Sequence, residues 1–213
     1  MNRQTIRIRF KKERDLRLIS HRDLARAFER LFRRIELPLA MSQGFHPHPK
    51  ISFPLALAVG VEGRNEVVDV VVDQEVAIAD VEERLKEQTP DGLVITKVEA
   101  VAAKPKSKVN RVCYQLSIPT ERIDSLVQTI DEFLKSSRHE VERSSNKRID
   151  IRPGVESIDL NGSTFEMELS VSQDYNVRPR EVLQALKIDD LEFEGHRLIR
   201  TNVYLDTEQS EVA

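Results

Sequence analysis

Residues 20–60 have the sequence SHRDLARAFERLFRRIELPLAMSQGFHPHPKISFPLALAVG, and this stretch decides the predicted fold. At about 100° per residue, its apolar side chains gather on one face of a helix. Ser20 suits the N-cap of that helix, with Asp23 in the capping-box position, and Pro38 ends it. The stretch therefore predicts an amphipathic helix that leads into a loop and then a strand. The inward positions are Leu24, Ala27, Phe28, Leu31 and Ile35.

The opposite face of the predicted helix is basic. Arg22, Arg26, Arg30 and Arg33 follow one another along it, and Arg34 flanks them. Arginines repeated in this way suit successive phosphates, because each guanidinium can bond a phosphate bidentately and release condensed counterions. The alternative is a solvated helix face, which Glu29 and Glu36 beside the stripe favour.

The elements on either side of the helix complete a β-α-β-β-α-β order. Residues 4–10 alternate between apolar side chains and a cationic outer face of Arg7 and Arg9. Leu16, Leu18 and Ile19 are expected to continue or pair that strand. After the loop, the expected elements are a strand over 51–61 with Pro54 at a sheet edge, a turn at 63–65, a strand over 66–73, a helix over 78–88 and a strand over 93–101.

The same order is expected again in the second half. The predicted elements are a strand over 109–118, a helix over 119–136, an irregular extended arm over 139–160, a hairpin turn at Asn161-Gly162, a strand over 165–171, a helix over 179–187 and a strand over 196–205. The inward side chains of the first of these helices are expected to be Ile123, Leu126, Val127, Ile130 and Leu134.

The predicted fold class is therefore α+β, with two tandem ferredoxin-like units and antiparallel sheets. The first unit spans residues 1–102 and contains the basic helix and, over residues 42–50, the loop with His46, Pro47, His48 and Pro49 that we call the His/Pro loop. A polar linker follows over 103–108, the second unit spans 109–205, and residues 206–213 form an acidic tail expected to be disordered.

Charge is unevenly distributed along the chain. Residues 1–50 carry 13 Lys and Arg against 5 Asp and Glu, a net of +8, whereas the remainder carries 20 against 31, a net of −11. This asymmetry favours a polyanion-binding face in the first unit. The alternative is that the basic quarter pairs with the acidic remainder of the chain.

The loop after the helix carries the other candidate site residues. Its proline-stiffened sequence presents Gln43, Gly44, Phe45, His46, His48 and Lys50, which suit phosphate or base contacts, with Phe45 as a stacking surface. General acid–base work on RNA by His46 or His48, with Lys50 stabilising charge, is an alternative. His21, at the helix start, is a further candidate that can approach this loop. Alternating directions of the two loop histidines disfavour a shared metal, and none is predicted.

Several classes of protein are excluded by composition. A single cysteine rules out an internal disulfide and a cysteine-rich metal site. The first residues have no apolar signal region, and no apolar run reaches the roughly 18 residues of a membrane span. No cofactor-binding glycine loop, catalytic triad or paired-carboxylate motif is present. We therefore expect a cytoplasmic protein without membrane contact or cofactor, and a binding role rather than catalysis.

The motifs resemble those of a bacterial radical-SAM-associated protein family, a domain of unknown function. The resemblance rests on LRLISHRDLARAFERLFRR, LPLAMSQGFHPHPKISFPLALAVGVEG and EVVDV, and it continues through RIDIRPGVESIDL, VRPREVLQAL and RTNVYL. Two positions depart from the family's pattern: Arg22 stands where many members have Leu, and Gly154 where members commonly have Tyr. The resemblance implies partnership with a radical S-adenosylmethionine enzyme and a connection with RNA or the ribosome. One cysteine is too few to hold that enzyme's cluster, so the chain is expected to present a substrate.

The function predicted is thus a non-catalytic RNA-binding accessory protein that presents RNA or a ribosome-related substrate to a radical SAM partner. One alternative is a metal-independent endoribonuclease that uses the loop histidines. CRISPR repeat-processing endoribonucleases also have tandem ferredoxin-like units, but this similarity is one of architecture alone. The other is a protein-interaction module for the radical SAM partner.

Overall fold

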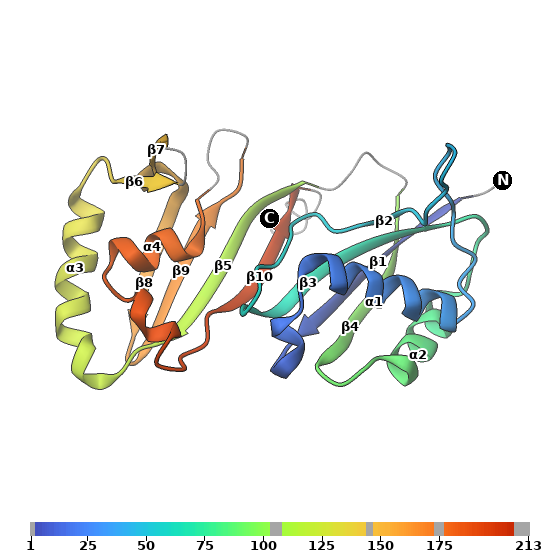
Figure 1. Cartoon of the computed structure of the whole chain (residues 1–213), viewed down its shortest axis with the longest axis horizontal. Helices are drawn as coiled ribbons and strands as arrows, with labels where there is room; N and C mark the ends of the chain where they lie inside the picture. The colour runs from blue at the N-terminus through green and yellow to red at the C-terminus, as the bar shows by residue number, and fades with distance from the viewer. Residues whose placement is uncertain (1–2, 103–107, 144–146, 173–176, 207–213) are drawn as a thin grey trace, which may run out of the picture. The chain divides into compact units, whose positions relative to one another are not determined.

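The computed structural model describes residues 3–102, 108–143, 147–172 and 177–206 (Figure 1). The chain divides into two compact units, with the boundary between Lys108 and Val109. Each unit combines one antiparallel sheet with two α-helices in the order β-α-β-β-α-β. The fold class is α+β with ferredoxin-like units, as the sequence predicts. The predicted linker and tail lie outside the described residues, except for Lys108 and Asp206, which are exposed.

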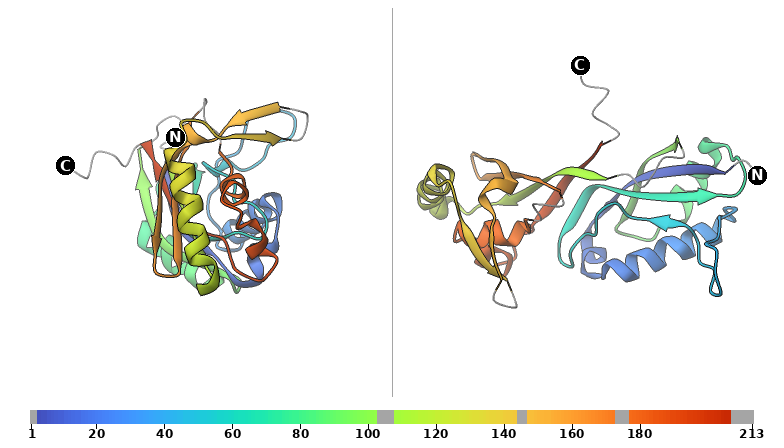
Figure 2. Two further views of the ribbon diagram at one scale, coloured as in Figure 1. Left: turned by 90° about the vertical axis from the view of Figure 1, so that its left-hand side faces the viewer. Right: turned by 90° about the horizontal axis from the view of Figure 1, so that it is seen from above.

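The first unit contains four strands and two helices. They are β1 (Gln4–Lys12), α1 (His21–Arg34), β2 (Ile51–Ser52), β3 (Glu62–Val72), α2 (Ile78–Gln88) and β4 (Leu93–Val101), with a 3-10 turn η1 (Arg14–Leu18) before α1. The strand order is β4-β1-β3-β2, and every neighbouring pair is antiparallel. Both helices lie on one face of this sheet (Figures 1 and 2).

The core of the first unit lies between its helices and its sheet. Alternate β1 side chains point toward the helices, so Ile6, Ile8 and Phe10 are buried. Phe28 of α1 packs edge-on against Phe10, with ring centroids 4.7 Å apart. Phe32 is also fully buried, although it was not predicted to face inward. This packing fixes the rotation of α1, and therefore decides which of its arginines face solvent.

Three local expectations in the first unit are wrong. Leu16 and Leu18 lie in η1 rather than in a strand, because the buried Lys12 ammonium bonds the Arg17 and Ile19 carbonyl oxygens at 3.3 and 3.0 Å and so holds a tight turn. The strand expected over 51–61 is only two residues long, since the residues around Pro54 leave the sheet. The residues expected to form a turn at 63–65 instead belong to β3.

The second unit repeats the order with one insertion. Its elements are β5 (Val109–Ser117), η2 (Thr120–Arg122), α3 (Ile123–Lys135), β6 (Glu140–Arg143), β7 (Lys147–Asp150), η3 (Arg152–Gly154), β8 (Val155–Asn161), β9 (Thr164–Ser170), α4 (Pro179–Ala185), η4 (Asp189–Glu192) and β10 (Ile199–Leu205). The strand order is β10-β5-β9-β8, again antiparallel throughout. The arm predicted to be irregular is therefore a hairpin of β6 and β7 followed by β8, the second strand of the unit's sheet.

The inward face of α3 also differs from expectation. Leu126, Ile130 and Phe133 are buried, whereas Val127 and Leu134 are 48% and 37% exposed. At about 100° per residue, Val127 and Leu134 lie on the flank of the helix, roughly a quarter turn from Leu126. The apolar arc of the sequence is thus wider than the strip that the sheet covers.

Candidate nucleic-acid interface

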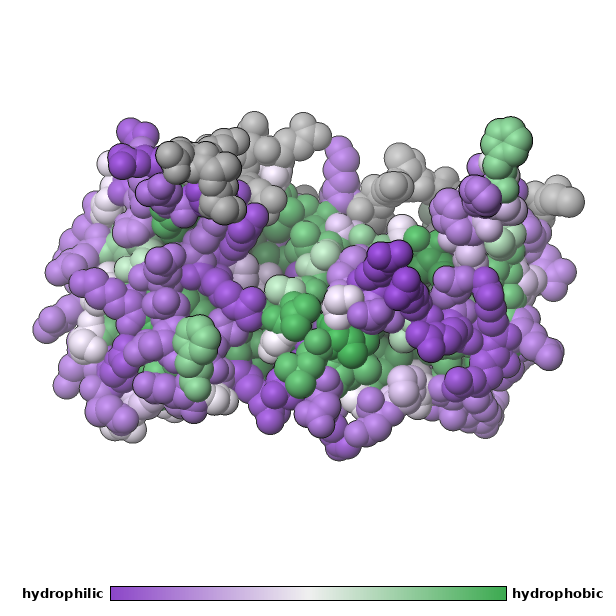
Figure 3. Space-filling view, in the orientation of Figure 1, coloured by the Kyte–Doolittle hydropathy of each residue, from purple (hydrophilic) through white to green (hydrophobic). Residues whose placement is uncertain are grey.

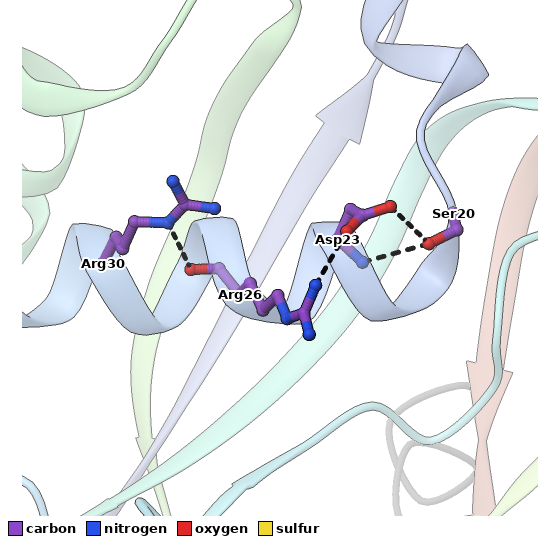
Figure 4. Close-up of polar contacts among 4 residues, drawn as sticks. All are labelled: Ser20, Asp23, Arg26 and Arg30. Atoms are coloured by element: carbon purple, nitrogen blue, oxygen red, sulfur yellow. Dashed lines mark hydrogen bonds and ion pairs between the residues drawn. The ribbon is translucent and has the colours of Figure 1, made fainter.

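The start of α1 is fixed by a local hydrogen-bond network (Figure 4). Ser20 is the N-cap, and its hydroxyl accepts from the Asp23 backbone N–H at 3.2 Å and donates to the Asp23 carboxylate at 2.7 Å. Arg26 reaches back to the same carboxylate at 3.4 Å. The Ser20 hydrogen bond, together with the charges of Arg26 and Arg22, holds the pKa of Asp23 below its ordinary value. Asp23 is therefore a carboxylate at neutral pH.

The exposed arginines of α1 follow the predicted stripe, and two of the five exposed arginines also line a groove toward α2. With Leu24 and Phe28 turned inward, the helical rotation places Arg22, Arg26 and Arg33 on the crest of the helix, opposite the core. We call these three residues the crest. Arg30 and Arg34 lie on the flank toward α2, as their contribution to a groove beside that helix shows. In Figure 3, hydrophilic side chains stand out over α1.

Partners of these arginines within the chain are few and exposed. Arg33 bonds Glu29 at 2.5 Å, and Arg26 bonds Asp23. Arg30 Nε bonds the Arg26 carbonyl oxygen at a long 3.4 Å. Ion pairs of this kind on a helix surface are screened by water and contribute little, so a phosphate can displace them at little cost. Two carboxylates do not neutralise five guanidinium groups, and the helix surface keeps a positive surplus.

The groove beside the flank arginines was not foreseen from the sequence. It has a volume of about 270 Å³, and its floor is made by Ile19, Ala27, Leu31 and Pro90. Pro90 follows α2, so the floor joins residues far apart in the chain. The only signal in the sequence is Ala27, a small side chain on the edge of an apolar helix face, which leaves room where a larger residue would fill it.

Polar groups stand around this apolar floor. Asp23 is at one end along the helix, and Arg30 and Arg34 are toward the other. Arg34 donates to the Gln88 carbonyl oxygen at 3.4 Å, which ties the helix flank to the end of α2. The groove therefore offers an acceptor, an apolar surface and two cationic donors in sequence along α1.

The His/Pro loop is a narrow projection whose base is anchored on β3. Backbone hydrogen bonds join Ala40 to Val71 at 2.8 Å and Val71 to Lys50 at 3.0 Å, so the loop leaves and returns at one point of the sheet. Figure 1 shows it rising beside the end of α1 where that helix finishes. Gly44 has φ +131°, a backbone conformation that L residues rarely adopt. Within the loop, the Ser42 backbone N–H donates to the His48 carbonyl oxygen at 2.8 Å, so a hydrogen bond of the loop itself helps to fix its shape.

The predicted loop contacts are largely exposed. Gln43, Phe45, His46 and His48 are all exposed, Phe45 completely so, and Lys50 is half-buried at the base. Figure 3 shows a hydrophobic side chain at the tip of an otherwise hydrophilic projection. Phe45 therefore presents both faces of its ring to solvent at the tip of the loop.

The three candidate histidines are not gathered at one place. His48 Nδ1 lies 3.0 Å from the Ser42 hydroxyl, so that ring nitrogen is engaged in shaping the loop. His21 is half-buried at the first residue of α1 and packs edge-on against Phe53, with ring centroids 5.1 Å apart. It lies about 20 Å along the helix from the end where the loop rises. This placement gives His21 a packing role and separates it from the loop histidines.

Arg7 and Arg9 do not form the exposed cationic face that their alternation predicts. Arg7 is buried, and its guanidinium bonds both carboxylate oxygens of Asp69 at 2.9 and 3.0 Å across neighbouring strands. Arg9, on the same central strand, is half-buried. The positive surplus of residues 1–50 is further reduced by ion pairs to later carboxylates, Arg3 to Asp73 and Arg14 to Asp91. Pairing with the acidic remainder, one of the two interpretations of the sequence, therefore accounts for several of these charges.

Comparison with known proteins places the chain in a family. The family described as "Uncharacterized protein conserved in bacteria (DUF2344)" matches residues 5–179. The chain belongs to this family. The match covers α1, the groove and the His/Pro loop, so the candidate interface lies within the family's shared region. None of the curated protein sequences matches the chain.

Similar solved structures include two proteins of very low sequence identity. One is an unknown protein from Galdieria sulphuraria, 12% identical, with 96% of this chain and 99% of that chain covered and a TM-score of 0.27. The other is described as a "putative glycine cleavage system transcriptional repressor", 10% identical, with 97% and 100% covered and a TM-score of 0.26. At these TM-scores neither likeness bears on the function of this chain.

Two searches of the described residues concern other kinds of site. No group of three His, Cys, Asp or Glu side chains comes together as a metal site in that part of the chain. Over the same residues, no helix is long and apolar enough to cross a membrane.

Proposed function

We propose that this protein is a non-catalytic RNA-binding accessory protein whose crest on α1 grips the RNA backbone. The observation that carries the proposal is the set of exposed guanidinium groups on one rigid helix, with only weak partners within the chain. A helix fixed by a buried phenylalanine core holds the backbone of these residues in place, so little backbone freedom is lost on binding. Phosphates gain charge-assisted hydrogen bonds and release counterions.

The His/Pro loop supplies the second contact in this proposal. Its exposed Phe45 offers a face on which an unpaired base can stack, and stacking of this kind contributes about 1–3 kcal/mol per base. His46 and His48 stand beside it as hydrogen-bonding groups. Recognition of a splayed-out base favours single-stranded RNA over a regular duplex.

The partner in this proposal is a radical SAM enzyme, to which the protein presents RNA or a ribosome-related substrate. The resemblance of the sequence motifs supports this step. An accessory role also suits an interface with no gathered set of acid–base groups: His21 packs on Phe53, and His48 Nδ1 faces Ser42. The test below also distinguishes the two alternative functions, which are docking of the partner through the basic helix and cleavage of RNA by the loop histidines.

The test compares two charge-reversed variants of the full chain. Arg22→Glu/Arg26→Glu/Arg33→Glu reverses the crest. Lys135→Glu/Arg138→Glu/Arg148→Glu makes the same change in net charge on exposed residues of the second unit. Binding of 5′-labelled single-stranded RNA is followed by fluorescence anisotropy, with circular dichroism as the check on folding.

We expect the crest variant to lose more than about tenfold in affinity and the second-unit variant to keep most of its affinity. Equal affinity of the two variants would overturn the proposal. Recovery of shortened RNA after incubation with wild type in chelator would support the endoribonuclease instead. The interaction module would be favoured by a third result. In it, wild type binds no RNA and keeps the radical SAM partner after nuclease treatment, whereas the crest variant loses the partner.

A further inference from the structure

Groups of different chemical character follow one another along the groove beside α1. Asp23 provides a carboxylate at one end, Ala27 and Leu31 provide an apolar floor, and Arg30 and Arg34 provide cations toward the other end. Asp23 and Arg30 are separated by seven residues, or about 10 Å along the helix axis. A ligand that matches this order has a hydrogen-bond donor, a flat apolar body and an anion, in that sequence.

We infer that the groove holds one unstacked nucleotide of the bound RNA, with an amino-bearing base toward Asp23 and its phosphate at Arg30 and Arg34. The inference rests on the proposed function, because the crest supplies most of the attraction for the RNA. It adds to that function a pocket and a preference among bases. Adenine, cytosine and guanine carry an exocyclic amino group, and uracil does not.

The size and lining of the groove suit a single base. A volume of about 270 Å³ lies below the usual range for drug-sized ligands, so a fragment such as one base fits better than a large molecule. The faces of a base are apolar and pack on Ala27, Leu31 and Pro90. The ionised Asp23 accepts a hydrogen bond from an amino group, as acidic side chains do from cytosine.

The crest and the groove are contiguous on one helix. Arg26 of the crest contacts Asp23 of the groove, and Arg30 of the groove bonds the Arg26 backbone (Figure 4). A strand that runs along the crest therefore passes the open side of the groove. One base of such a strand can turn into the groove while neighbouring phosphates stay on Arg22 and Arg26.

The experiment fills the groove without changing its charge. Ala27→Leu places a larger side chain on the floor, and Ala25→Leu makes the same change on the other flank of α1, where Ala25 is also half-buried. Separately, Asp23→Asn removes the carboxylate charge with almost no change in side-chain size, and circular dichroism checks that α1 stays folded, because Asp23 also bonds Ser20. Affinities for 5′-labelled r(C)12 and r(U)12 are measured by fluorescence anisotropy for the full chain and each variant.

We expect wild type to bind r(C)12 about tenfold more tightly than r(U)12. Ala27→Leu and Asp23→Asn should each reduce this preference to about twofold or less, while Ala25→Leu should keep it. Equal binding of the two oligonucleotides by wild type would overturn the inference, as would an unchanged preference in both groove variants.

Failure of the groove and failure of the proposed function give different results. If reversal of the crest abolishes binding of both oligonucleotides but the groove variants behave as wild type, only the nucleotide pocket is wrong. If wild type binds neither oligonucleotide, both the pocket and RNA binding are overturned.

Discussion

Replacement of Asp69 tests whether Arg7 is structural, as its position indicates, or an RNA contact, as its place in the sequence predicts. The two side chains are 5% and 11% exposed and share two hydrogen bonds of 2.9 and 3.0 Å across β1 and β3. Asp69→Asn removes the carboxylate charge that faces the buried Arg7 guanidinium. Loss of one partner of a buried pair costs about 3–5 kcal/mol, a large part of the stability of a small domain.

Urea unfolding followed by circular dichroism measures this cost. For a unit of about 100 residues, a loss of 3 kcal/mol lowers Tm by more than about 10 °C. The double variant Arg7→Met/Asp69→Leu replaces the pair with apolar side chains, so it should recover most of the lost stability. The folded double variant should also bind single-stranded RNA as wild type does.

Two results would refute this reasoning. Asp69→Asn with wild-type stability would mean that the pair is not a buried structural element. A stable double variant that has lost RNA affinity would return Arg7 to the RNA interface.

Three further predictions concern other parts of the chain. Burial by itself raises the pKa of Glu181, but hydrogen bonds from the Arg143 guanidinium and the backbone of Arg178 outweigh it and lower that pKa below the ordinary 4.5. The stabilisation is complete above about pH 4.5 and is lost as pH falls through the folded-state pKa. Glu181→Gln should therefore lower the free energy of unfolding by about 1 kcal/mol at pH 7, after allowance for solvent screening, and the difference from wild type should shrink as pH falls below 4.5. Phe45→Ala should weaken single-stranded RNA binding about tenfold without change in Tm, since the ring is fully exposed. Gly63→Ala should destabilise the first unit by about 1–3 kcal/mol in urea unfolding, because its Cβ would overlap Cγ of the buried Glu66.

Matched variants serve as controls for these predictions. Glu142→Gln alters an exposed carboxylate on β6 and should leave the pH profile unchanged. Phe193→Ala removes a phenylalanine that is 92% exposed in the second unit and should leave RNA binding unchanged. A pH profile that shifts equally in the Glu142 and Glu181 variants, or RNA affinity lost equally in both phenylalanine variants, would contradict the corresponding prediction.

Periodicity predicted α1, α2 and β4, which pack against one another in the first unit. The apolar repeat of α1 and its Ser20 cap are confirmed, as are the bounds of α2 and β4. The class of each unit follows, because the order of elements leaves few ways to cover one sheet with two helices. The insertion of β6 and β7 was missed, since a short hairpin outside the main sheet has no buried face to impose strict alternation.

Some features of the candidate site could likewise be predicted from the sequence, and others could not. The exposure of Arg22, Arg26 and Arg33 could be predicted because it depends only on the rotation of one helix. The burial of Arg7 could not, because it depends on Asp69, which lies 62 residues away in the chain. The groove could not be predicted either, since its floor needs Pro90 of a different element beside Ala27. Local patterns thus predict which side chains face away from the core. Pairing with residues distant in the sequence decides which of these side chains can still contact a ligand.

The salt dependence of RNA binding is the most direct measure of the central claim that the crest neutralises phosphates. For single-stranded RNA, the slope of log K against log salt concentration changes by about 0.7 for each phosphate contact, so removal of three contacts should make the slope shallower by about 2. We predict this change for Arg22→Glu/Arg26→Glu/Arg33→Glu, and a wild-type slope for the second-unit variant. Parallel slopes for wild type and the crest variant would contradict the account.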